Sequence, residues 1–170
     1  YLDKSYTPDE IKLDTKIESM LFDLNVETKS FNCSLLWEPR IILKPDESPY
    51  KVFTPFYKRG CLNSSVPSKP VGEPKQINFI KHSECANLGS LKLIDKYKWS
   101  SKLDSHWVIT EQAAVQNFEN FLSDKIDRYK IDRDYPYKDS NSKLSPHLRF
   151  GMISVNRMWH ELLSLPKNSG

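Results

Sequence analysis

The sequence predicts an α/β segment followed, after a linker, by an all-α segment. A helical pattern at 7–25 leads directly into a strand pattern at 26–31, which is the order of an αβ unit in a parallel sheet. Residues 60–100 hold no sustained helical or strand period, and three prolines crowd into 67–74. The remaining third of the chain has helix and loop patterns. We therefore expect two incomplete domains of different fold class.

The first predicted element is an amphipathic helix at 7–25. Thr7 and Glu10 have capping-box spacing, and Pro8 stands in the first turn. Its apolar residues recur on one face: Leu13, Ile17, Met20, Leu21 and Leu24. The following VETKSF alternates as a strand does. Further on, the segment 41–53 places a Pro/Asp/Ser turn between two apolar runs, which predicts a hairpin or paired extended segments.

Two further helices are predicted in the C-terminal third. Thr110 can cap the first, whose apolar positions recur every three to four residues: Ala114, Val115, Phe118, Leu122, Ile126 and Tyr129. A polar, proline-broken loop covers 130–143. Ser154 can cap the second helix, whose stripe is Val155, Met158, Trp159 and Leu162.

Composition limits the protein class. The 170 residues include 25 Lys and Arg against 22 Asp and Glu, a formal charge of +3, so any nucleic-acid contact must be local. Three cysteines at wide spacings predict neither a disulfide framework nor a metal site, and His82 and Cys85 lack a second ligand pair. With no apolar run long enough for a bilayer, we expect a cytoplasmic protein, or a nuclear one in a eukaryote. Its first residue, Tyr1, and its last, in LPKNSG, suggest an interior piece of a longer protein.

Four segments resemble one family. Residues 129–154, YKIDRDYPYKDSNSKLSPHLRFGMIS, are similar to the flavin-binding signature of DNA photolyases and cryptochromes. Upstream, SFNCSLLWEP and PYKVFTPFYKRGC resemble the family's exit from its antenna domain, and WVITEQAAVQNFENFL resembles the helix that opens its flavin domain. These matches follow the family's order, and class I enzymes acting on cyclobutane pyrimidine dimers look closest.

The resemblance implies a domain division. Residues 1–56 would be the C-terminal part of the antenna domain, the tail of a doubly wound parallel sheet. Residues 57–105 would be an interdomain linker, and 106–170 the start of the helical FAD-binding domain.

The turn at 141–145 has the chemistry of a phosphate site. The pyrophosphate of FAD favours backbone N–H groups, small hydroxyl or amide donors and a nearby cation, and Asn141, Ser142, Lys143 and Ser145 offer these groups. Taken alone, the turn fits a helix cap better; its flanking matches favour the phosphate site. By resemblance, the FAD-contacting residues are Tyr129, Asn141, Ser142, Lys143, Leu144 and Ser145.

This turn departs from the family pattern at two positions. The family usually has Thr where Asn141 stands and often Arg where Lys143 stands. Lysine keeps the positive charge but lacks the planar fork of a guanidinium, so weakened flavin binding is expected.

Arg133 is the predicted DNA contact. The resemblance places it on the rim that faces damaged DNA, where a phosphate contact would be independent of sequence. The alternative is a surface arginine paired with Asp132 or Asp134. No residue of the chain is predicted to be catalytic, and His147 and His160 read as packed or surface histidines.

The resemblance implies a light-driven flavoenzyme, a deoxyribodipyrimidine photo-lyase that splits cyclobutane pyrimidine dimers by electron transfer from reduced FAD. Its partners would be damaged DNA and a C-terminal half present as a separate chain, and its antenna chromophore a folate or deazaflavin. By itself this chain is expected to be inactive and to bind FAD weakly or not at all. Two alternatives stay open: a fragment of a cryptochrome photoreceptor, and a degenerate remnant with no cofactor.

Overall fold

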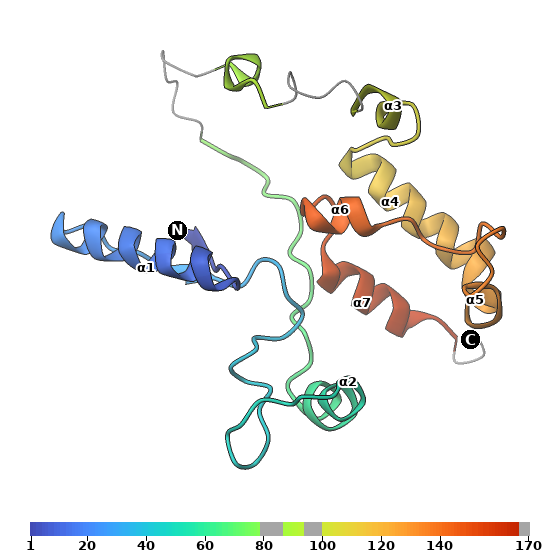
Figure 1. Cartoon of the computed structure of the whole chain (residues 1–170), viewed down its shortest axis with the longest axis horizontal. Coiled ribbons are helices and arrows are strands. Elements are labelled where there is room, and N and C mark those ends of the chain that lie inside the picture. Colours follow the sequence, from blue (N-terminus) through green and yellow to red (C-terminus); the bar gives the residue numbers. More distant parts are fainter. Residues whose placement is uncertain (79–86, 94–99, 167–170) are drawn as a thin grey trace. The chain divides into compact units, whose positions relative to one another are not determined.

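The computed structural model describes residues 1–78, 87–93 and 100–166 (Figure 1). The chain divides into two compact units, Tyr1–Ser68 and Lys69–Gly170, which are treated separately below. The first contains a small parallel sheet and the second is helical, so the predicted order of α/β followed by all-α is confirmed. The finer division at residues 56 and 105 stays a prediction.

The first unit is built on a β-α-β arrangement. Strand β1 (Leu2–Asp3) pairs in parallel with β2 (Ser30–Phe31), and helix α1 (Pro8–Asp23) connects them. Thr7 stands at the N-cap and its hydroxyl donates a hydrogen bond to the Glu10 carboxylate at 2.6 Å, but its side chain makes no hydrogen bond to the helix backbone, so the predicted capping box is not formed. Such a connection is what a parallel pair requires, because parallel strands cannot be joined by a tight turn.

Helix α1 has the predicted apolar face but does not bury it. None of its residues, all of which the structure describes, is buried, and Leu13, Met20 and Phe22 are more than half exposed. The physical reason is the size of the sheet. Two strands of two residues each offer too little surface to cover one side of a 16-residue helix.

The segment from 41 to 63 forms the buried part of the first unit. Leu43 and Pro49 make an antiparallel bridge around a turn, so the predicted paired extended segments are present as a single bridge. A continuous helical stretch follows, made of α2 (Phe53–Pro55), the π-turn η1 (Phe56–Gly60) and the 3₁₀-turn η2 (Cys61–Asn63). Ile42 and Cys61 are almost fully buried.

The second unit consists of helices and turns. Its elements are η3 (Leu88–Leu91), α3 (Ser100–Asp104), α4 (Glu111–Asn120), η4 (Phe121–Lys125), α5 (Ile126–Asp132), α6 (Ser145–Arg149) and α7 (Val155–Ser164) (Figure 1). The Thr110 hydroxyl accepts a hydrogen bond from the Ala113 N–H at 3.1 Å, which confirms the predicted cap. In the described part of the chain, no helix combines the length and the apolar character that crossing a membrane requires.

The core of the second unit joins α4 to the turn that precedes α6. Ala114 and Phe118 lie one helical turn apart on α4 and pack with Leu144 and Ile153. Three partly buried side chains cover this cluster: Leu122, Met152 and Met158. Leu144 therefore fixes the turn to helix α4.

Candidate functional site

In the turn at 141–145, the Leu144 side chain lies in the core and the polar side chains are exposed or half-buried. The Leu144 side chain is 2% exposed and lies in the core, so it is not available to a ligand. Asn141, Lys143 and Ser145 are exposed, and Ser142 is half-buried. Five of the six predicted cofactor-binding residues thus belong to one turn whose hydrophobic member holds it in place.

Lys143 has a left-handed backbone conformation, with φ of 53°. For a residue with a Cβ atom this conformation costs about 1–2 kcal/mol relative to the right-handed region. Lys143 is neither glycine nor asparagine, the residues that usually adopt it. Asn25, Glu47 and Lys92 have the same left-handed conformation, so this conformation marks a tight turn at Lys143 and does not by itself indicate a ligand site.

A single carboxylate connects Lys143 to the helix before it. The Lys143 ammonium lies 2.7 Å from Asp139 Oδ1, and the Lys125 ammonium lies 3.0 Å from Asp139 Oδ2. Hydrogen bonds from Lys143 and then from Lys125 hold the pKa of Asp139 below its ordinary value. Asp139 therefore stays ionised at lower pH than an isolated aspartate, and the three groups together carry one net positive charge.

The i, i+4 spacing of Asp139 and Lys143 could have suggested their ion pair from the sequence. Lys125 could not have been found this way, because it precedes Asp139 by 14 residues and meets it through the tertiary fold. It stands at the end of η4, where a π-turn shifts the helical register between α4 and α5.

Tyr129 and Arg133 lie together on α5 and just after it. The Tyr129 ring makes an edge contact with Phe121, with 5.3 Å between ring centroids. The Arg133 guanidinium lies 5.8 Å from the Tyr129 centroid, and its Nε is 3.4 Å from Asp134 Oδ1. Both partners of this ion pair are largely exposed, so it is worth at most about 1 kcal/mol and leaves Arg133 free to exchange partners.

His147 is fully buried beside the same turn. Its Nε2 lies 3.1 Å from the Val108 carbonyl oxygen, which can only accept, so Nε2 carries a proton and donates this bond.

A hollow of about 560 Å³ lies next to the turn at 141–145. Its lining residues are His106, Trp107, Val108, Ala113, Gln116, Asn117, Lys143 and His147. The exposed Lys143 side chain thus borders a space that a ligand can enter.

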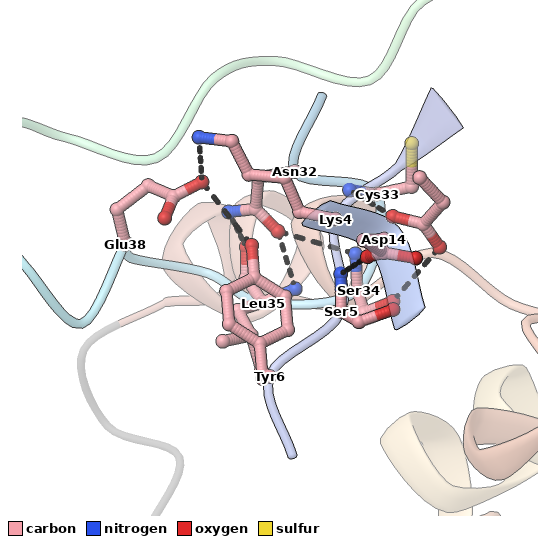
Figure 2. A network of polar contacts seen from close by, with 10 residues as sticks. Lys4, Ser5, Tyr6, Asp14, Asn32, Cys33, Ser34, Leu35 and Glu38 are labelled. Atoms are coloured by element: carbon pink, nitrogen blue, oxygen red, sulfur yellow. Dashed lines mark hydrogen bonds and ion pairs between the residues drawn. The ribbon is translucent and has the colours of Figure 1, made fainter. Parts of the chain in front are cut away.

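A second polar cluster lies in the first unit, directly after β1. Figure 2 shows the Lys4 ammonium and the Tyr6 hydroxyl both donating to Glu38 Oε1, each at 3.1 Å. Burial, and then the hydrogen bond to Glu38, raise the pKa of Tyr6 to about 12, so the phenol remains a neutral donor at physiological pH. This cluster borders a hollow of about 350 Å³ at the carboxyl end of β1, the edge where α/β sheets bind ligands.

Within 1–78, 87–93 and 100–166, no group of three or more His, Cys, Asp or Glu side chains is arranged to hold a metal ion. His82 and Cys85 lie outside the described residues.

This chain is similar to DNA photolyases and to a cryptochrome. Residues 1–75 match the family model described as DNA photolyase. The deoxyribodipyrimidine photo-lyase of Agrobacterium fabrum is 30% identical over 167 residues, which cover 97% of this chain and 35% of that protein. Cryptochrome-1 of Arabidopsis thaliana is 27% identical over 157 residues, covering 91% of this chain and 23% of its own length.

A solved structure agrees with these relatives. The crystal structure of a bacterial class III photolyase from Agrobacterium tumefaciens matches with a TM-score of 0.85 and 28% identity, over 98% of this chain and 36% of that one. The chain spans about a third of the length of the first two photo-lyases that it matches. Closeness to class I enzymes in particular stays a prediction.

Proposed function

Because this chain belongs to the DNA photolyase and cryptochrome family, we propose that it forms part of a light-driven DNA repair flavoprotein. Its fold is the tail of the family's α/β antenna domain followed by the start of the helical domain. The proposed activity is that of a deoxyribodipyrimidine photo-lyase, which splits cyclobutane pyrimidine dimers in damaged DNA. Bound reduced FAD would supply the electron for this reaction.

The observation that carries this proposal is an exposed cation, Lys143, on a turn that the buried Leu144 holds to the core. A pyrophosphate needs a cation and several small donors, and the turn supplies the Lys143 ammonium, the Asn141 amide and the hydroxyls of Ser142 and Ser145. The donor set therefore fits the phosphates of FAD. Tyr129 is proposed as the sixth contact; Leu144 can take part through its backbone.

Arg133 is proposed to contact a DNA phosphate. Its ion pair with Asp134 is exposed, so exchanging the carboxylate for a phosphate costs little. Such a contact strengthens binding to any DNA sequence and weakens with salt. Selection of the damaged site would have to come from groups other than Arg133.

The remaining part of the proposal concerns the larger protein. An antenna chromophore, a folate or deazaflavin, would be held by the α/β domain.

A photoreceptor function is the second candidate, favoured by the match to Cryptochrome-1. The two functions differ in their DNA specificity. A repair protein assembled with this chain would bind a duplex containing one pyrimidine dimer more tightly than the same undamaged duplex, whereas a photoreceptor would bind both alike.

The experiment that tests the flavin site restores the family's residues. The double variant Asn141→Thr, Lys143→Arg is expected to raise FAD affinity by about tenfold, because the guanidinium can form two parallel hydrogen bonds to phosphate. Fluorescence quenching of FAD by each protein measures this. The matched control is Lys130→Arg, an exposed position on α5 that should leave the affinity unchanged. An unchanged affinity in the double variant would favour the remnant without cofactor.

A further inference from the structure

We propose that Asp139 competes with an anionic ligand for Lys143, and that Lys125 relieves this competition. The inference rests on the proposed function, in which the turn at 141–145 binds a diphosphate. It adds two residues, neither of which is in the turn, and assigns them opposite effects on affinity.

The contacts define the competition. Lys143 donates to one oxygen of Asp139 and Lys125 donates to the other, at 2.7 and 3.0 Å. The side chains of Asp139 and Lys143 are 61% and 59% exposed, whereas that of Lys125 is 24% exposed. Lys125 is therefore the more fixed partner, and Lys143 is the partner that can turn towards a ligand.

Binding of a phosphate to Lys143 removes one cation from Asp139. Without a second cation, the carboxylate would be left unpaired close to the negative charges of the ligand, and the two would repel each other. With Lys125 in place, Asp139 keeps a partner at 3.0 Å when Lys143 leaves. Lys125 thus allows Lys143 to change partners without exposing the ligand to a bare carboxylate.

The neighbouring charges do not replace Lys125. Lys125 and Asp139 line a further hollow, of about 340 Å³. Its other lining residues are Asp124, Arg128, Asp132, Lys138 and Ser140. Arg128 and Lys138 line the same hollow but are both paired with Asp132. Asp124 adds a negative charge, so removal of Lys125 would leave the surroundings of Asp139 more anionic.

The experiment is a titration of the full 170-residue chain with ADP, followed by amide NMR or calorimetry. Lys125→Met is expected to weaken ADP binding by about three- to tenfold, the effect of one charge several ångströms away near a protein surface. Asp139→Asn is expected to strengthen it by a similar factor. In the double variant Lys125→Met, Asp139→Asn, affinity should return at least to that of the wild type.

Matched variants separate this local effect from net charge and from damage to the fold. Lys130→Met changes the net charge equally from an exposed position on α5 and should weaken binding by less than about twofold. Asp127→Asn, also exposed on α5, should fail to restore binding to Lys125→Met. A merely structural role for Lys125 would lower thermal stability and would not be rescued by Asp139→Asn.

Three outcomes would overturn the proposal. If millimolar ADP does not bind the wild type, both this inference and the proposed flavin site fail. If ADP binds the wild type but Lys125→Met binds it equally well, the inference alone fails. It also fails if Asp127→Asn restores binding as fully as Asp139→Asn does, because the effect is then one of total charge.

Discussion

Replacing Leu144 with alanine is expected to lower the free energy of unfolding of the Lys69–Gly170 unit by about 2–5 kcal/mol. Leu144 is 2% exposed and packs with Ala114, Phe118 and Ile153, so the shorter side chain loses buried surface and leaves a cavity. Because the same residue anchors the turn, the variant should also lose affinity for ADP. Urea unfolding followed by circular dichroism measures the first effect.

The control for this prediction is Leu163→Ala on α7. Leu163 is 62% exposed, so its truncation should change the free energy of unfolding by less than about 0.5 kcal/mol. Equal stability of Leu144→Ala and the wild type would show that the turn is not held by this core.

Substituting alanine for Gly60 is expected to destabilise the Tyr1–Ser68 unit by about 1–3 kcal/mol through overpacking. An added Cβ atom would lie 2.5 Å from Ile42 Cγ2 and 3.1 Å from the Tyr50 ring. Ile42 is 3% exposed and branched at Cβ, so it cannot move aside easily. Hydrogen exchange of the backbone amides in this unit would measure the loss of stability.

A double-mutant cycle makes this second prediction specific. Ile42→Ala removes the obstructing methyl group, so the cost of Gly60→Ala should be smaller in that background than in the wild type. Gly72→Ala, outside this unit and with nothing within 4 Å of its added Cβ, controls only for the exchange of glycine for alanine and should leave the Tyr1–Ser68 unit unchanged. Additive effects of the two substitutions at 42 and 60 would contradict the packing described.

Local signals in the sequence were enough to locate the main helices. The helix predicted over 7–25 is observed at Pro8–Asp23, because capping residues and proline fix a helix start without help from the rest of the fold. Thr110 and Ser154 likewise stand at the N-cap positions of α4 and α7, although only the Thr110 side chain makes the cap hydrogen bond. These elements depend on neighbours within one or two turns, which a sequence displays directly.

Features that depend on tertiary structure were not predictable. The strand pattern over 26–31 forms two residues of strand, because a parallel strand extends only as far as its partner allows. The π-turn at Phe121–Lys125 interrupts a pattern that reads as one α-helix. The short helix α6 lies between the predicted loop at 130–143 and the helix predicted from Ser154, where the sequence pattern predicted no element.

The candidate site also combines features that the sequence predicts with features that only the fold shows. The polar turn and the departures at Asn141 and Lys143 could be identified from residue types and resemblance. The burial of Leu144 and the contact between Lys125 and Asp139 required the fold, since each joins groups far apart in sequence. The sequence therefore predicts which groups would contact a phosphate, and the structure adds the core residue that holds the turn and the carboxylate that is paired with Lys143.

The central claim is that the turn at 141–145 binds the phosphates of a dinucleotide. Comparing amide NMR spectra of the chain titrated with ADP and with adenosine tests it most directly, because the two ligands differ only in their phosphates. The claim predicts that ADP shifts the signals of residues 141–145 and that adenosine leaves them in place. Equal shifts with both ligands, or ADP shifts confined to other residues, would contradict it.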